Sequence, residues 1–429
     1  MHVSRMSRRL GLVALPAALA LTVAACGSSN SDNSAGGGTS SNSSSASSGS
    51  NDVLGTPKPA TGSPVTIGMI SDGKNSTLDD TDEYRGAQAA AAYANAYLGG
   101  INGHKINVKV CQARQDPAAA TDCANQMVTA HASVVVEGTL AEVDQTVKVL
   151  SPAKIPLVAG AASTQLALSS PNVFSLFNGL SYFGVPAAAA KAEGVKKADM
   201  VVIAVPGAEG PARQVGVMLY KNEGVDATVT AIAPGTADMT PQITAASANK
   251  PGLYHIFGND SFCTPAISAI KTVDPSAKII ALSQCLSPAG AATIPGGYAG
   301  VQVITTSDLD PANPETKLFD AVMAKYGQGS KGTLLGSQGY APMLGLINAL
   351  NAAKVTDTSA AGILAGIKSA PATTYPLAAG AKFQCTGKQM PIAPNICSFD
   401  GILASAKADG TLTDYKLMPA DPGLYVPAK

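Results

Sequence analysis

Groups that can form hydrogen bonds follow most of the short apolar runs that we predict to be buried strands. These candidates for ligand binding are Ser71, Thr139, Ala162, Ser163, Glu209, Asp260 and Gln284. Hydroxyl, carboxylate, amide and backbone groups can orient a small molecule, and the carboxyl ends of parallel strands meet along one edge of a sheet. Tyr182 lies where the chain would pass between two series of strands, and its ring suits a packing contact or a ligand contact equally well. The residue types therefore predict a site that holds a small polar molecule.

Catalytic and metal-binding patterns are not found. The sequence has no GxSxG, no HExxH and no phosphate-binding GxxxxGK loop. No CxxC pair occurs, and the four histidines are scattered: His2, His104, His131 and His255. Such a set provides neither a base beside a nucleophile nor the ligand spacing of a zinc site. We therefore expect no enzyme, no metal ion and no cofactor.

The N-terminus reads as an export signal that ends at a cysteine. Arg5, Arg8 and Arg9 precede an apolar run over residues 10–25, which is too short for an ordinary membrane span. The sequence VAAC that ends at Cys26 resembles a bacterial lipobox, in which the cysteine receives a lipid and becomes the first mature residue. The alternative is an ordinary signal peptide with an incidental cysteine. We expect lipidation of Cys26 and a membrane-anchored, extracytoplasmic protein.

The composition after Cys26 predicts a tether followed by a folded region. Gly, Ser, Asn, Ala and Thr dominate the first part, and such a segment cannot bury enough apolar surface to offset its ordering entropy. We therefore expect a signal peptide over 1–25, the lipid-bearing cysteine and tether over 26–62, and a folded domain over 63–429. Lys plus Arg and Asp plus Glu both number 29, so charge does not favour nucleic acid as a partner.

Six further cysteines suggest disulfides, because an even number in an exported chain is typical of them. Sequence alone leaves 15 connectivities open. Our prediction is the pairing of nearest neighbours, namely Cys111 with Cys123, Cys263 with Cys285, and Cys385 with Cys397.

β-Branched runs alternate with alanine-rich helical segments along the folded region. The first series extends from "VTIGMIS" to "IPLVAGAAS", and the second from "MVVIAVPG" to "KIIALSQ". This alternation predicts two α/β lobes, each a doubly wound parallel sheet covered by helices on both faces. The C-terminal "NICSFDGILASAKADGTL" has the turn residues and the alternation of a hairpin.

The residues from Tyr84 to Val128 resemble the type I periplasmic solute-binding proteins of branched-chain amino acid ABC importers. That family has a similar helix, a GGIxG turn, a strand, and a DPxxA helix start. The matching positions are Gly99, Gly100, Ile101, Gly103, Asp116, Pro117 and Ala118. Further segments in the same order are "IPLVAGAAS", "ADMTPQI" and the C-terminal "DG" turn.

The resemblance implies two lobes joined by three crossover strands, with a ligand cleft between them that closes by a hinge. The first lobe would comprise about 63–180 plus 305–372. The second would comprise about 181–304 plus 373–429. The partners implied are a small solute and the permease subunits of an ABC transporter, and we expect a monomer. A lipoprotein that senses a solute for a signalling partner is the alternative function.

The resemblance also assigns roles to the candidate residues. The loop from Thr139 to Ala141 and the segment at Ala162 and Ser163 would hold a ligand carboxylate and amine through backbone groups and a hydroxyl. Family members that bind amino acids commonly carry a carboxylate near the position of Gln284, which has no charge. Asp260 or Glu209 could supply that charge instead, so an amino-acid ligand stays open.

An acidic group precedes the first long helix of the folded region: Asp72, Asp79, Asp80, Asp82 and Glu83. Carboxylates at a helix N-terminus complement the helix dipole. We expect these side chains to be solvated.

Overall fold

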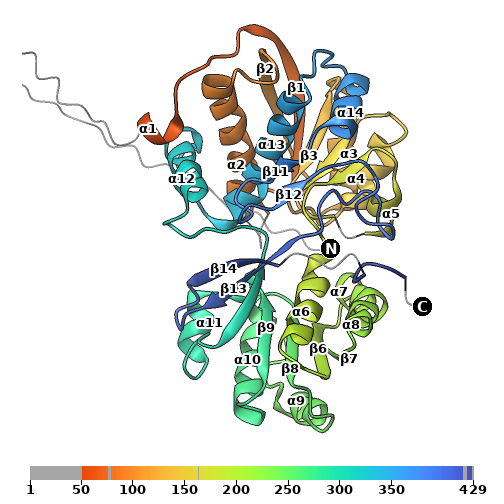
Figure 1. Cartoon of the computed structure of the whole chain (residues 1–429), viewed down its shortest axis with the longest axis vertical. Helices are drawn as coiled ribbons and strands as arrows, with labels where there is room; N and C mark the ends of the chain where they lie inside the picture. Colours follow the sequence, from red (N-terminus) through yellow and green to blue (C-terminus); the bar gives the residue numbers. More distant parts are fainter. Residues whose placement is uncertain (1–50, 76–78, 163, 419–422, 428–429) are drawn as a thin grey trace, which may run out of the picture. The chain divides into compact units, whose positions relative to one another are not determined.

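Two β-sheets organise the part of the chain that the structure describes. The computed structural model describes residues 51–75, 79–162, 164–418 and 423–427. Figure 1 shows each sheet with its own helices, forming two lobes. The first lobe holds a five-stranded sheet in the order β2 (His104–Gln112), β1 (Gly62–Ser71), β3 (Val134–Glu137), β4 (Leu157–Ala159) and β5 (Val173–Ser175). The second holds a seven-stranded sheet in the order β14 (Leu412–Met418), β13 (Gly401–Ala406), β10 (Val301–Thr305), β9 (Lys278–Leu282), β8 (Leu253–Phe257), β6 (Lys197–Ile203) and β7 (Asp226–Ile232).

The strand pairing is that of doubly wound sheets. All neighbouring strands of the first sheet run parallel. In the second sheet the strands from β6 to β10 pair in parallel, whereas β13 runs antiparallel to both β10 and β14. The strand order changes direction between β1 and β3 in one sheet and between β6 and β8 in the other. Such switch points are where ligands bind in open α/β sheets. The predicted α/β fold with two such lobes is confirmed.

Helices cover both sheets and connect their parallel strands. The first lobe has α1 (Asn51–Leu54), α2 (Thr81–Tyr93), the π-helix η1 (Ala94–Leu98), α3 (Pro117–Thr129), α4 (Val143–Leu150), α5 (Gln165–Ser169), α12 (Pro314–Tyr326), α13 (Leu334–Ala352) and α14 (Ala360–Ser369). The second has α6 (Ser181–Ala192), α7 (Pro206–Pro211), the π-helix η2 (Ala212–Gly216), α8 (Val217–Asn222), α9 (Thr240–Ser247), α10 (Asp260–Val273), the 3-10 helix η3 (Ser283–Cys285) and α11 (Pro288–Thr293). None of the helices in the described ranges combines the length and the apolar character that crossing a bilayer requires.

The chain passes between the lobes three times, as expected. It leaves the first lobe between β5 and α6, returns between β10 and α12, and leaves again before β13. The last passage lies later in the chain than residue 372, the predicted boundary. Residues after 372 include the short antiparallel pair β11 (Thr373–Thr374) and β12 (Lys382–Phe383), whose Phe383 packs in the first lobe's core. The Cys397 N–H also donates to the Ser175 carbonyl at the end of β5 (2.8 Å), so the segment up to Cys397 belongs with the first lobe.

The tether also ends earlier than position 62. Leu54 is buried in the core of the first lobe, and the Tyr93 hydroxyl donates to its carbonyl (3.4 Å). Lys58 N–H donates to the Ala96 carbonyl (2.9 Å), which fixes the backbone further along. The polar composition of this stretch concealed the single large apolar side chain, Leu54, that anchors it.

Local signals for turns and helix starts have the predicted geometry. Gly99 and Gly100 adopt φ values of 74° and 65°, which favour glycine at the end of a helix. Asp116 caps α3 by accepting from Ala119 N–H (2.7 Å), with Pro117 at the first helical position. Side-chain caps also fix the starts of two other helices, Asn259 for α10 and Thr333 for α13.

All three predicted disulfides are present. Cys111–Cys123 joins β2 to α3, Cys263–Cys285 joins α10 to η3, and Cys385–Cys397 closes the segment that follows β12. Each bridge therefore lies within one lobe.

Helices α2 and α13 approach each other closely because glycines line their contact. A Cβ atom added at Gly339 would lie 1.9 Å from the Glu83 carbonyl oxygen, and one at Gly86 would lie 2.1 Å from the Gly336 carbonyl oxygen. Both are main-chain atoms inside helices, so neither can move away without shifting a whole element. This contact determines where α2 holds Glu83.

We predict that Gly339→Ala destabilises the fold by about 1–3 kcal/mol, because the added methyl group forces the two helices apart. Thermal unfolding followed by circular dichroism would show a lower melting temperature. The matched control is Gly210→Ala in α7, where an added Cβ has no neighbour within 4 Å; it should leave stability unchanged or raise it by up to about 1 kcal/mol. Equal melting temperatures for the two variants would contradict this account of the contact.

Candidate ligand-binding site

A cavity of about 330 Å³ opens onto the carboxyl ends of strands from both lobes. The first lobe contributes residues 137–141, Val143, 159–162, Thr164, Ser337, Gln338, Ala341 and Tyr375. The second lobe contributes Tyr182, Phe257, Leu282 and Gln284, and the passage after β10 contributes Thr306 and Ser307. Its size falls in the range of small-molecule pockets, about 300–1,000 Å³.

Four of the candidate residues from the sequence line this cavity. Thr139 lies in the loop after β3 and Ala162 in the segment after β4. Tyr182 lies in the first turn of α6, and Gln284 in η3 directly after β9. The structure therefore brings together residues from both series of strands. Their contact with a ligand stays a prediction.

Three other candidates do not line it. Ser71 is fully buried, where its hydroxyl donates to Glu83 and accepts from Gly73 N–H (3.2 Å). Glu209 is paired with Arg213 on the same helical segment (2.8 Å). Asp260 is exposed, and its carboxylate accepts from the N–H of Ser261 (2.8 Å). Neither acid can substitute for the charge that Gln284 lacks in this arrangement.

Two remaining assignments fall outside the described residues. These are Ser163, which is adjacent to Ala162 in the sequence, and the lipidation site Cys26.

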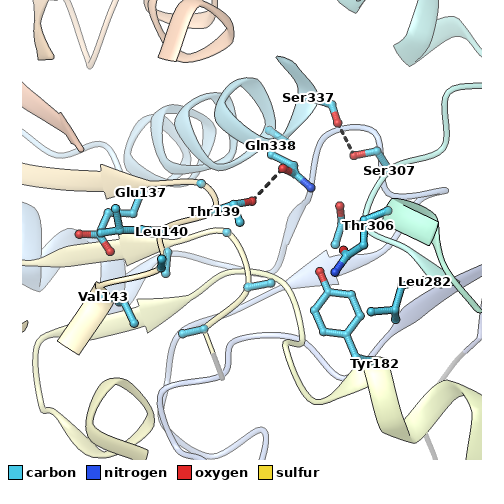
Figure 2. A pocket seen from close by; sticks show the side chains of 18 of the residues that line it. Glu137, Thr139, Leu140, Val143, Tyr182, Leu282, Thr306, Ser307, Ser337 and Gln338 are labelled. Atoms are coloured by element: carbon cyan, nitrogen blue, oxygen red, sulfur yellow. Dashed lines mark hydrogen bonds between the residues drawn. The ribbon is translucent and has the colours of Figure 1, made fainter. Parts of the chain in front are cut away.

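The loop after β3 is held by carboxylates from the first lobe. Thr139 N–H donates to Glu83, and Ala141 N–H donates to Asp72 (3.1 Å). The Thr139 hydroxyl donates to the Gln338 side-chain oxygen on α13 (2.8 Å), as Figure 2 shows. The loop is therefore positioned by β1, α2 and α13 together.

The acidic group before and within the first turn of α2 is not uniformly solvated, contrary to our expectation. Glu83 is fully buried and Asp72 is 2% exposed. Helical spacing contained the signal: Glu83 lies three, four and seven positions before Gly86, Ala87 and Ala90, all of which are buried. Sequence reasoning missed Glu83 because a carboxylate on the apolar face of a helix was read as part of the cap.

Burial makes these acids unusually weak. Desolvation raises the pKa of Glu83 to about 8, although hydrogen bonds from Ser71 and Thr139 oppose the shift. Desolvation also raises the pKa of Glu137, which lines the cavity, to about 8, and the nearby Glu83 carboxylate adds to the effect. The Thr146 hydroxyl, which donates to the Val143 carbonyl (2.7 Å), opposes the shift.

Aromatic rings and hydroxyl groups form the rest of the wall. The Tyr182 ring meets the Phe257 ring edge-on, with 6.4 Å between centroids. Burial raises the pKa of Tyr182 to about 12, so it stays a neutral hydroxyl at physiological pH. Ser307 and Ser337 share a buried hydrogen bond of 2.8 Å (Figure 2). Tyr182 thus both packs in the second lobe and faces the cavity.

Hydroxyl and amide groups make up most of the polar lining of the cavity. None of the described residues that line the cavity is Lys, Arg, His or Cys. Over the described ranges, no group of three or more His, Cys, Asp and Glu residues could hold a metal ion. What the lining offers is hydroxyl and amide groups between apolar surfaces, which can orient and enclose a small molecule.

The family model described as "Periplasmic binding protein" matches residues 64–394, most of the chain. The chain belongs to the periplasmic binding protein family. A comparison with curated protein sequences gave no match.

Solved structures with the same fold include several substrate-binding proteins. The periplasmic binding protein described here is 16% identical to the branched-chain amino acid transporter substrate-binding protein LivJ from Streptococcus pneumoniae in complex with isoleucine, with a TM-score of 0.63 over 83% of this chain and 99% of the other. It is likewise 16% identical to the leucine-binding protein LivK from Thermotoga maritima, with the same TM-score and coverage. A solute-binding protein of an ABC transporter from R. palustris in complex with 4-hydroxybenzoate is 17% identical, with a TM-score of 0.66 over 84% and 98%. These likenesses establish the two-lobe fold, and the family match confirms the predicted resemblance to periplasmic solute-binding proteins.

The buried Glu137 gives this periplasmic binding protein a pH-dependent stability with a defined sign. The folded protein keeps the Glu137 proton up to about pH 8, whereas the unfolded chain releases it near the ordinary value of 4.5. Between those values the folded state binds more protons, so its stability falls as pH rises. Glu137→Gln removes this titration. We predict that the difference in melting temperature, variant minus wild type, increases by about 2 °C or more between pH 5 and pH 8.

The control for that series is Asp226→Asn, which changes an exposed carboxylate on the edge strand β7. Its melting temperature should follow the wild type across the same pH range. A Glu137→Gln difference that stays constant with pH would show that Glu137 is ionised throughout in the folded protein.

Proposed function

We propose that this chain is a lipid-anchored, extracytoplasmic solute-binding protein of an ABC importer. It captures a small polar solute, an amino acid or a related small organic acid or amide, between its lobes by hinge closure and delivers it to the permease. The observation that carries the proposal is the cavity lined from both lobes at the carboxyl ends of their strands. A solute that contacts both lobes favours the state in which they enclose it.

Three further features support the proposal. The family match covers most of the folded region, and structures of the same fold are substrate-binding proteins with isoleucine or 4-hydroxybenzoate bound. Among the described residues, three backbone passages connect the lobes, and loop connections of this kind can act as hinges. The sequence that ends at Cys26 supplies a lipid attachment site that would keep the domain beside a membrane permease.

We predict that a solute from a library of amino acids, aromatic and aliphatic acids, amides, polyamines and sugars raises the melting temperature of residues 48–429, which form one compact unit. A ligand specific to the folded state stabilises it by about 2.7 kcal/mol at one hundred times its Kd. Ala161→Trp fills the cavity and should abolish the shift, whereas Ala237→Trp on an exposed loop should preserve it. A shift that survives Ala161→Trp would locate the ligand elsewhere.

We predict that the full chain, expressed in a bacterium, fractionates with the membrane and that Cys26→Ser releases it or leaves it unprocessed. The thiol of Cys26 would carry the lipid, and a serine cannot form the thioether. Detergent partitioning and mass spectrometry of the mature N-terminus provide the measurement. Ser28→Ala is the matched control and should stay in the membrane. A soluble wild-type protein that is cleaved elsewhere would indicate an ordinary signal peptide.

A further inference from the structure

The cavity has features that disfavour a ligand carboxylate. Two backbone donors of the loop after β3, Thr139 N–H and Ala141 N–H, already donate to Glu83 and Asp72. A ligand carboxylate could use these donors only by displacing acids of the protein itself. Glu83 is fully buried and its other carboxyl oxygen is bonded to Ser71, so displacing it from Thr139 would leave one buried oxygen without a partner.

The charges around the cavity also disfavour a ligand carboxylate. Its described lining residues include one acid, Glu137, and no Lys, Arg or His that could neutralise a bound carboxylate. Glu83 lies directly behind the loop, since a Cβ added at Gly138 would be 2.3 Å from its carboxylate oxygen. Bringing a negative charge into this space is unfavourable because no described lining residue carries a charge of opposite sign to offset the lost hydration.

Glu137 itself has unused hydrogen-bonding capacity. It is 1% exposed, and neither of its carboxyl oxygens has a hydrogen-bond partner among the described residues. Figure 2 shows it beside Leu140 and Val143, on the side of the cavity away from Tyr182. An acid in this position can accept a hydrogen bond from a ligand hydroxyl or amide N–H in the cavity, either directly or through water.

The opposite side offers neutral groups. Gln338 accepts from Thr139 through its oxygen, which leaves its amide nitrogen available as a donor toward the cavity. Thr306 and Tyr182 add hydroxyl groups, and Phe257 adds an apolar ring face. These groups can bind a carbonyl, an amide or a hydroxyl without any net charge.

We propose that the cavity takes an uncharged solute that carries amide or hydroxyl groups, and that it discriminates against free carboxylates. The inference rests on the proposed solute-binding function and narrows its ligand class. It assigns the discrimination to Glu83 and Asp72, which occupy the loop donors, and to Glu137, which is among the residues that line the cavity.

The test is isothermal titration at pH 7 with matched pairs of acid and amide: isovalerate with isovaleramide, 4-hydroxybenzoate with 4-hydroxybenzamide, and L-leucine with L-leucinamide. Within the pair that binds, the amide is expected to bind at least tenfold more tightly than the acid. Glu83→Gln and Glu137→Gln keep the side-chain shape and remove an ionisable carboxyl group, so each should reduce that ratio at least threefold in a second titration at pH 9, where both wild-type acids are ionised. The effect should be smaller at pH 7, where both are largely protonated. Asp226→Asn, far from the cavity on β7, is expected to preserve it.

The outcomes separate the two proposals. Tighter binding of the acid in any pair overturns the inference and leaves solute binding intact. Binding of L-leucinamide alone would show that the acids select an ammonium group, and the proposal of an uncharged solute would be wrong. If no member of any pair binds to a folded sample, the solute class of the proposed function is contradicted and the inference falls with it. A melting curve for each variant distinguishes loss of folding from loss of discrimination.

Discussion

The buried carboxyl group of Glu83 is the interaction on which the first-lobe side of the cavity depends. It joins the end of β1, through Ser71, to the loop after β3, through Thr139. Helix α2 carries this acid, and α13 fixes α2 through the glycine contact at Gly339. A single side chain thus connects two strand ends and a helix pair. The position of the cavity wall is a consequence of how closely two helices pack.

Much of the fold could be predicted from the sequence because its signals are local and repeated. Alternating strands and helices specify parallel sheets, and glycines and capping residues fix element ends such as Gly99 and Asp116. The disulfide pairs followed from proximity along the chain. The last passage between the lobes was misplaced because the hydrogen bond from Cys397 to Ser175 joins residues that are distant in sequence.

The candidate site was predictable only in outline. Strand ends indicated the correct loops, and Thr139, Tyr182 and Gln284 do line the cavity. The direction of each side chain depends on tertiary contacts that no local pattern reveals. Asp260 thus turns to the start of its own helix and Glu209 to Arg213. Glu137, the last residue of the apolar strand β3, was not among the predicted site residues.

The arrangement of the disulfides has a consequence for how such a protein can be observed. No bridge among the described cysteines links one lobe to the other, and the six from Cys111 to Cys397 are all paired. A chain that begins after Cys26 would therefore carry no other thiol. One cysteine introduced at the rim of either lobe would be the sole attachment point for a fluorophore. The emission of that dye would report the movement of the lobes while every native covalent link stays in place.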